Sequence, residues 1–115
     1  EVYQLMLYDP EIYASRIAPL KHIKYTHTVS YCYDVIHENG GKQIGIPAMA
    51  AHYGIRNDEI LVFGDGPNDV DMLRDVGFGV AMGNGCAKAK AAANYVTTDV
   101  DDDGIYRALK ELGVI

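Results

Sequence analysis

The sequence has few basic residues, few cysteines and no long apolar run. It carries 10 Lys and Arg against 16 Asp and Glu, for a formal net charge of -6 at pH 7, so it lacks the basic footprint of a nucleic-acid-binding domain. No apolar run approaches the roughly 20 residues of a membrane-spanning helix, and the first residues lack the charged-then-apolar order of a signal peptide. We therefore expect neither a nucleic acid nor a membrane as a partner.

The two cysteines, Cys32 and Cys86, have no metal-ligand spacing. This usage is typical of reduced thiols in a cytoplasmic protein. The 115 residues suit one domain that is long enough to bury a core. Because the overall charge is negative, an anionic substrate would have to be bound by local groups or by a metal ion.

Strand-like and helix-like segments alternate along most of the chain. The segment from Val2 to Tyr8 reads as a strand, and Asp9 and Pro10 then supply an N-cap and a proline at the first helical position. Further segments follow: strands at 23–29 and 30–36, a helix to about 53, a strand at 60–63, a helix at 69–76, a strand at 78–82, a helix at 87–93, a strand at 95–98 and a helix at 105–112. The alternation predicts an α/β fold with a parallel sheet between helices.

The segment Gly64–Leu73 is the most informative part of the sequence. It follows the apolar run Ile60–Phe63, which reads as a buried parallel strand, and ligands bind at the carboxyl ends of such strands. Asp65 and Asp69 offer oxygen ligands for a divalent ion, and Asn68 offers a donor for a phosphate. The alternative is that Asp69 only caps the next helix and Asp65 only fills a turn, and residue types alone favour neither reading.

Lys42 follows two glycines at the start of a predicted helix. A cation is unfavourable at the positive end of a helix dipole, and a bound anion would remove the penalty. The alternative is a side chain that points into water. Pro47 would clash one turn back in a helix that began at Lys42, so the sequence predicts either a start near Gly45 or a kink.

Other motifs do not fit known sites. The glycines at 77–83 are one residue off the dinucleotide fingerprint and run into a strand, and residues 40–43 lack the first glycine and the Ser or Thr of a P-loop. No histidine has an i+4 partner or a metal spacing, which favours surface or satisfied core histidines. The acidic run at 99–103 ends in Gly104 and a helix, so a solvated loop whose last carboxylate favours the helix N-terminus explains it best.

Four blocks of sequence together resemble the haloacid dehalogenase superfamily, specifically its Cof-type phosphatases with a C2 cap. The blocks are Gly41–Gln43, Phe63–Leu73, Gly79–Asn84, and Lys90–Thr97 followed by Asp103–Ile105. The resemblance implies a three-layer αβα, Rossmann-like core with a parallel sheet. It assigns residues 1–28 to the C-terminal remnant of an α+β cap and residues 29–115 to the C-terminal half of the catalytic core.

The resemblance also implies an activity, the Mg²⁺-dependent hydrolysis of a small phosphorylated metabolite, often a sugar phosphate, through a phosphoaspartyl intermediate. Lys42 would match the lysine that neutralises the transferring phosphoryl group. Asp65 would match a carboxylate of the Mg²⁺ site, and Asn68 the amide that contacts phosphate. Asp69 would hold the geometry of the site, for example by binding Lys42.

One departure from the family is large. The Asp-x-Asp-Gly-Thr motif, which carries the nucleophile, and the Ser or Thr of the next strand are missing. The chain therefore looks like the C-terminal half of such a protein, inactive alone and partnered by its own N-terminal half. A non-catalytic Mg²⁺- or phosphate-binding domain and a fragment of a P-type ATPase stay open as alternatives, and the upstream part of the gene would distinguish them.

Overall fold

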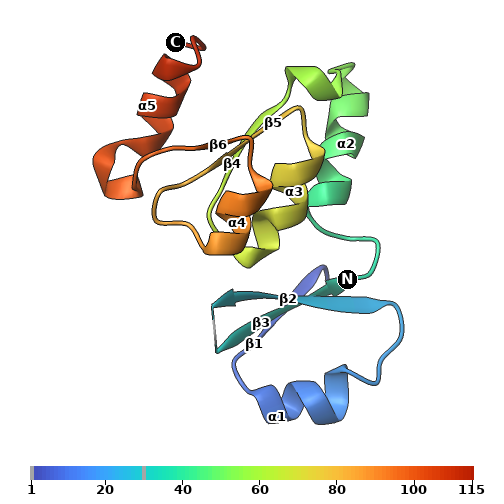
Figure 1. Ribbon diagram of the computed structural model, residues 1–115. Helices are drawn as coiled ribbons and strands as arrows, with labels where there is room; N and C mark the ends of the chain where they lie inside the picture. The colour runs from blue at the N-terminus through green and yellow to red at the C-terminus, as the bar shows by residue number, and fades with distance from the viewer. Residues whose placement is uncertain (1, 30) are drawn as a thin grey trace.

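The computed structural model describes residues 2–29 and 31–115, which form two separate three-stranded sheets. The strand order is β1-β3-β2 in the first sheet and β4-β5-β6 in the second. Figure 1 shows the first sheet and α1 on one side of the molecule, with the second sheet and the longer helices on the other. The strand β2 packs against the turn η3 of the second half, so the two parts are in contact.

The first sheet is antiparallel and contains β1 (Gln4–Leu7), β2 (Ile23–Val29) and β3 (Cys32–His37). The connection from β1 to β2 holds α1 (Pro10–Ile12) and the π-helical segment η1 (Tyr13–Ile17). The Asp9 carboxylate accepts hydrogen bonds from the N–H groups of Glu11 at 2.8 Å and Ile12 at 3.3 Å. The predicted N-cap at Asp9 is therefore confirmed.

The last strand of the first sheet ends at His37, and the next strand of the chain begins at Leu61. The domain boundary that the sequence analysis placed after residue 28 stays a prediction. That residue lies within β2, which pairs with β3 in the first sheet. The segment 30–36 was correctly expected to hold a strand, but the sheet to which a strand belongs depends on its distant partners. The residues of β3 themselves carry no signal that names those partners.

The second sheet is parallel, as the sequence predicted, with β4 (Leu61–Gly64), β5 (Phe78–Ala81) and β6 (Tyr95–Val96). Helices and turns connect its strands: α2 (Lys42–Tyr53) and η2 (Asn57–Glu59) before β4, η3 (Pro67–Asp69) and α3 (Val70–Asp75) after it, α4 (Ala87–Ala92) after β5, and η4 (Val100–Asp102) and α5 (Gly104–Glu111) after β6. Figure 1 shows α2 and α5 at opposite ends of this sheet.

The core of the second half lies between the sheet and its helices. Met72 and Leu73 of α3 pack with Ala81 of β5 and Ala89 of α4, and all four are buried. Val62 of β4 packs against this cluster from the sheet. The burial fixes α3 against β4 and β5, and so fixes the β4–α3 loop at the carboxyl end of the sheet. No helix in the described residues is long and apolar enough to cross a membrane.

Candidate functional site

The loop from β4 to α3 places three polar residues, Asp65, Asn68 and Asp69, at the carboxyl end of the parallel sheet. The chain leaves β4 at Gly64 and forms the short 3₁₀ turn η3 before α3 begins. The backbone carbonyl of Asp65 accepts a hydrogen bond from the N–H of Cys86 at 2.8 Å. The loop is therefore fixed at both ends, and its position is the one at which open α/β sheets bind ligands.

Asp69 is the centre of the site and is only 3% exposed. Its Oδ2 accepts hydrogen bonds from the backbone N–H groups of Asp65 at 2.9 Å and Gly66 at 3.1 Å. Its Oδ1 accepts one from Lys42 Nζ at 2.5 Å. Both oxygens are thus satisfied within the chain, which is the condition under which a buried carboxylate is tolerated.

The environment of Asp69 keeps its carboxyl group ionised. Burial alone would raise its pKa, because desolvation disfavours the charged form. The hydrogen bond from Lys42 and those from the Asp65 and Gly66 N–H groups, together with the Lys42 charge, outweigh burial and hold the pKa below its ordinary value. A permanently charged Asp69 can therefore orient Lys42 at neutral pH.

Asp69 does not act as the side-chain cap of α3, which was one of the two readings of the sequence. It occupies the N-cap position of α3, but its side chain makes no capping hydrogen bond to that helix. Instead the Asp69 side chain turns back toward the end of β4. A Cβ atom added at Gly64 would lie 2.7 Å from the Cβ atom of Asp69. Glycine at position 64 is therefore a packing requirement of the Asp69 side chain.

Lys42 is the first residue of α2 and follows Gly41, whose φ of 109° favours glycine. Its side chain is 51% exposed, and it does not simply extend into water, because its ammonium group reaches Asp69. The anionic partner offsets the unfavourable position of the lysine at the positive end of the helix dipole. Two residues that are 27 positions apart in sequence are thus brought together.

The predicted alternative that α2 begins near Gly45 is wrong. The helix begins at Lys42, and the N–H groups of Ile44 and Gly45 both reach the Gly41 carbonyl, at 3.1 and 2.9 Å. Pro47 lies inside the helix, where it has no N–H to donate to the preceding turn. The rest of the helix is stabilised by its packing, since Ala50 is buried and Ile46 contacts the core.

Asp65 and Asn68 differ from Asp69, because their side chains are available to a ligand. Within residues 2–29 and 31–115, neither side chain has a hydrogen-bonding or ionic partner in the structure. Asp65 is exposed and Asn68 is half-buried. By contrast, the nearby Asp71 and Asp75 are both paired with Arg74.

The residues at this site fit one ligand position for Mg²⁺. The described part of the chain contains no cluster of three or more His, Cys, Asp or Glu residues that could hold a metal ion by itself. Mg²⁺ commonly takes only one or two carboxylates and keeps several waters. The unpaired carboxylate of Asp65 is therefore a suitable single ligand, and the two oxygens of Asp69 are already occupied by internal hydrogen bonds.

The acidic run at 99–103 behaves as a turn. The Asp99 carboxylate accepts a hydrogen bond from the N–H of Asp101 at 3.1 Å. Asp103 occupies the N-cap position of α5 with a φ of 55°, and its side chain makes no capping bond. The carboxylate at the helix N-terminus therefore acts through its charge alone.

A cavity of about 790 Å³ lies between the two sheets, next to the site. Lys42 and Asn68 line it on the side of the second sheet. Residues of the first sheet line it on the other side: Gln4, Lys24, Thr26, Asp34 and Ile36. The sequence analysis missed this second wall, although the polar residues at alternating positions 24 and 26 of a strand were a signal for it.

The comparison with known proteins identifies the family. Residues 6–109 match the model of the haloacid dehalogenase-like hydrolases. The chain belongs to this family. The resemblance found in the sequence is thereby confirmed, and so is the α/β fold with a parallel sheet and flanking helices.

Three relatives show the extent of the match. The YkrA protein of Bacillus subtilis is 38% identical over 117 residues, which cover 100% of this chain and 45% of YkrA. The phosphatase BT1666 of Bacteroides thetaiotaomicron is 38% identical with a TM-score of 0.88, covering 100% of this chain and 43% of BT1666. The subclass IIB sugar phosphatase BT4131 is 38% identical with a TM-score of 0.89, covering 100% of this chain and 45% of BT4131. The chain thus spans less than half the length of these relatives and corresponds to their C-terminal part.

Proposed function

We propose that this chain is the C-terminal part of a Mg²⁺-dependent phosphomonoester hydrolase. The observation that carries the proposal is the pair of Lys42 with the buried Asp69, beside the unpartnered side chains of Asp65 and Asn68, at the carboxyl end of a parallel sheet. In this arrangement the cation of Lys42 and the amide of Asn68 line the cavity, and the free carboxylate of Asp65 lies on the same loop as Asn68. Proteins catalyse phosphoryl transfer chiefly by positioning the reactants and by placing fixed charges and hydrogen-bond donors around the phosphoryl group.

Each side chain has a distinct role in the proposal. Lys42 places a positive charge against the transferring phosphoryl group, and Asp69 is the positioning residue that holds Lys42 in place. The Asn68 amide donates a hydrogen bond to a phosphate oxygen. Asp65 offers one oxygen to Mg²⁺, which when bound neutralises charge on the phosphoryl group.

The covalent step belongs to a segment outside this chain. The sequence lacks the Asp-x-Asp-Gly-Thr motif of the family, so the aspartate nucleophile would come from the upstream half of the same protein. The first sheet and α1 are then part of the cap, and residues from Lys42 onward are part of the catalytic core. The substrate is a small phosphorylated metabolite, and a sugar phosphate is favoured because the similar protein BT4131 is a sugar phosphatase.

Hydrolysis of para-nitrophenyl phosphate tests the proposal. The full-length protein, with the upstream half restored, should release para-nitrophenol with Mg²⁺ and not after removal of Mg²⁺ by EDTA. The 115-residue chain alone should show no turnover, because it has no nucleophile. Activity of the separated chain that follows the protein through purification, or full activity without Mg²⁺, would contradict the proposal.

A further inference from the structure

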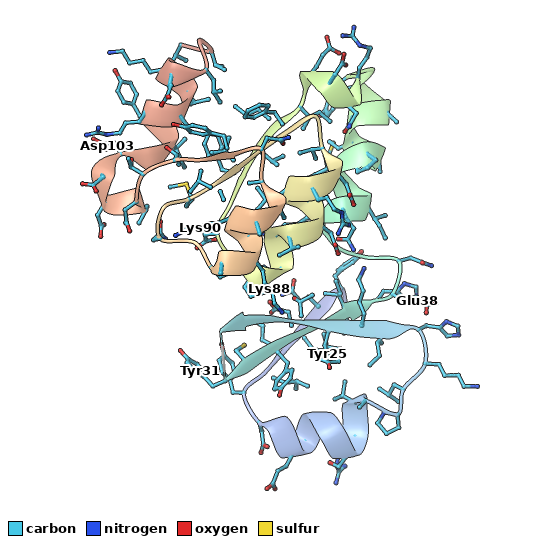
Figure 2. All side chains as sticks on the ribbon, viewed as in Figure 1. Tyr25, Tyr31, Glu38, Lys88, Lys90 and Asp103 are labelled. Carbon is cyan, nitrogen blue, oxygen red and sulfur yellow. The ribbon has the colours of Figure 1, made fainter. Side chains whose placement is uncertain are left out.

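The wall of the cavity formed by the first sheet presents a lysine to the site. In the hairpin of β2 and β3, Lys24 is paired with Ile36 and Thr26 with Asp34. Residues at alternating positions share one face of a sheet, and all four line the cavity that also contains Lys42 and Asn68. Figure 2 shows side chains in the space between the first sheet and the helices α3 and α4.

Lys24 is half-buried, and within the described residues it has no hydrogen-bonding or ionic partner. The carboxylate on the same face, Asp34, is 8% exposed and accepts a hydrogen bond from the Gln4 amide at 2.9 Å. The other lysine of the cavity, Lys42, is paired with Asp69. Lys88 lies on the side of α4 toward the first sheet (Figure 2), but it does not line the cavity.

A partly desolvated ammonium group without a partner is unfavourable, and an anionic group of a ligand would compensate it. The strand that carries Lys24 packs against η3, the turn that carries Asn68 and Asp69. The cavity of about 790 Å³ lies in the roughly 300 to 1,000 Å³ range of metabolite sites. It is larger than a phosphoryl group requires, so it leaves room beside the first sheet for the rest of a substrate.

We propose that Lys24 is a specificity-determining residue that binds a second anionic group of the substrate, a carboxylate or a second phosphate on the leaving group. This inference rests on the proposed function: Lys42 and Asn68 bind the transferring phosphoryl group, and Lys24 binds the far end of the same molecule. The enzyme then prefers phosphomonoesters that carry a second acidic group over monophosphates whose sugar has no acidic group.

The test is a steady-state comparison in the full-length protein with three probes. Glucose 6-phosphate has one acidic group, 6-phosphogluconate adds a carboxylate, and fructose 1,6-bisphosphate adds a phosphate. The wild type should show a higher kcat/KM for at least one of the last two probes. The probe with the preference identifies the second group as carboxylate or phosphate.

Replacement of Lys24 should then affect only the preferred probe. Lys24→Gln keeps most of the length of the side chain and removes the charge, so KM for that probe should rise roughly 10- to 100-fold with kcat unchanged. Lys24→Arg should recover part of the loss, since it restores the charge. Lys21→Gln is the matched control, because Lys21 is exposed and does not line the cavity, and it should leave all three probes unchanged.

Three results would overturn the inference while leaving the proposed function intact. They are an absence of preference among the probes in the wild type, an equal loss on all three probes in Lys24→Gln, and a loss in kcat with KM unchanged. An equal loss would mean that Lys24 contacts the transferring phosphoryl group. If the wild type hydrolysed none of the probes and no para-nitrophenyl phosphate, the proposed function itself would fail.

Discussion

Replacing Asp69 with asparagine is the sharpest perturbation of the site, because Asp69 connects the β4–α3 loop to α2. Asparagine has nearly the same shape, and its Oδ1 can still accept from the Asp65 and Gly66 N–H groups. The charge-assisted bond from Lys42 is lost. A hydrogen bond to a charged group contributes about 1.5 to 3 kcal/mol, and Lys42 is 51% exposed, so we expect a loss near the lower limit of that range. Asp69→Ala should be worse, at roughly 3 kcal/mol or more, because the Asp65 and Gly66 donors also lose their acceptor.

The pH dependence separates this explanation from a general packing defect. The pKa of Asp69 is lowered in the folded protein, so its stabilisation is fully present above the unfolded pKa of about 3.9 and is lost as pH falls through the lower folded value. The difference in free energy of unfolding between wild type and Asp69→Asn should therefore be largest at pH 6 to 7 and shrink below about pH 4. Urea unfolding of the full-length protein measures it. An equal difference at every pH, or no destabilisation, would refute the reasoning.

Three further predictions concern the residues around Asp69. Lys42→Ala should lower kcat/KM of the full-length protein, with a loss of transition-state stabilisation of roughly 2.7 to 4 kcal/mol. Lys42→Arg should restore only part of the activity, because a planar guanidinium replaces a point charge. A Lys42→Ala protein with the full rate and a higher stability would show that the lysine is a surface residue. Asp65→Asn should weaken Mg²⁺ binding in calorimetry. Asp75→Asn is the control and should leave Mg²⁺ binding unchanged, because the Asp75 carboxylate is paired with Arg74. Equal Mg²⁺ affinities for the wild type and Asp65→Asn would show that Asp65 is not a metal ligand. Gly64→Ala should destabilise the protein by about 1 to 3 kcal/mol in urea unfolding, because its methyl group would lie 2.7 Å from the Asp69 Cβ, and an unchanged midpoint would show that the loop can move away.

The parts of the fold that depend on local sequence could be predicted. Four apolar residues, a glycine turn and a helical periodicity are enough to place β4, η3 and α3, and Asp9 followed by proline is enough to place the start of α1. The same applies to the parallel order of the second sheet, because strands that alternate with helices pair in parallel.

The parts that depend on distant contacts could not be predicted from the residues alone. The sheet to which β3 belongs is decided by β1 and β2, and the start of α2 at Lys42 is favoured by an ion pair with a residue 27 positions away. Pro47 made a later start appear better, since its local effect is visible in sequence and the tertiary compensation is not. The cavity wall with Lys24 likewise required the packing of β2 against η3.

The central claim is that Lys42, Asn68 and Asp65 surround a bound phosphoryl group and its metal. A crystal structure of the full-length protein with Mg²⁺ and vanadate, which mimics a phosphoryl group in transfer, tests it most directly. We expect Lys42 Nζ and Asn68 Nδ2 within hydrogen-bonding distance of vanadate oxygens, and an Asp65 carboxylate oxygen at about 2.0 to 2.1 Å from Mg²⁺. Vanadate bound away from Lys42 and Asn68, or Mg²⁺ coordinated without Asp65, would contradict the account.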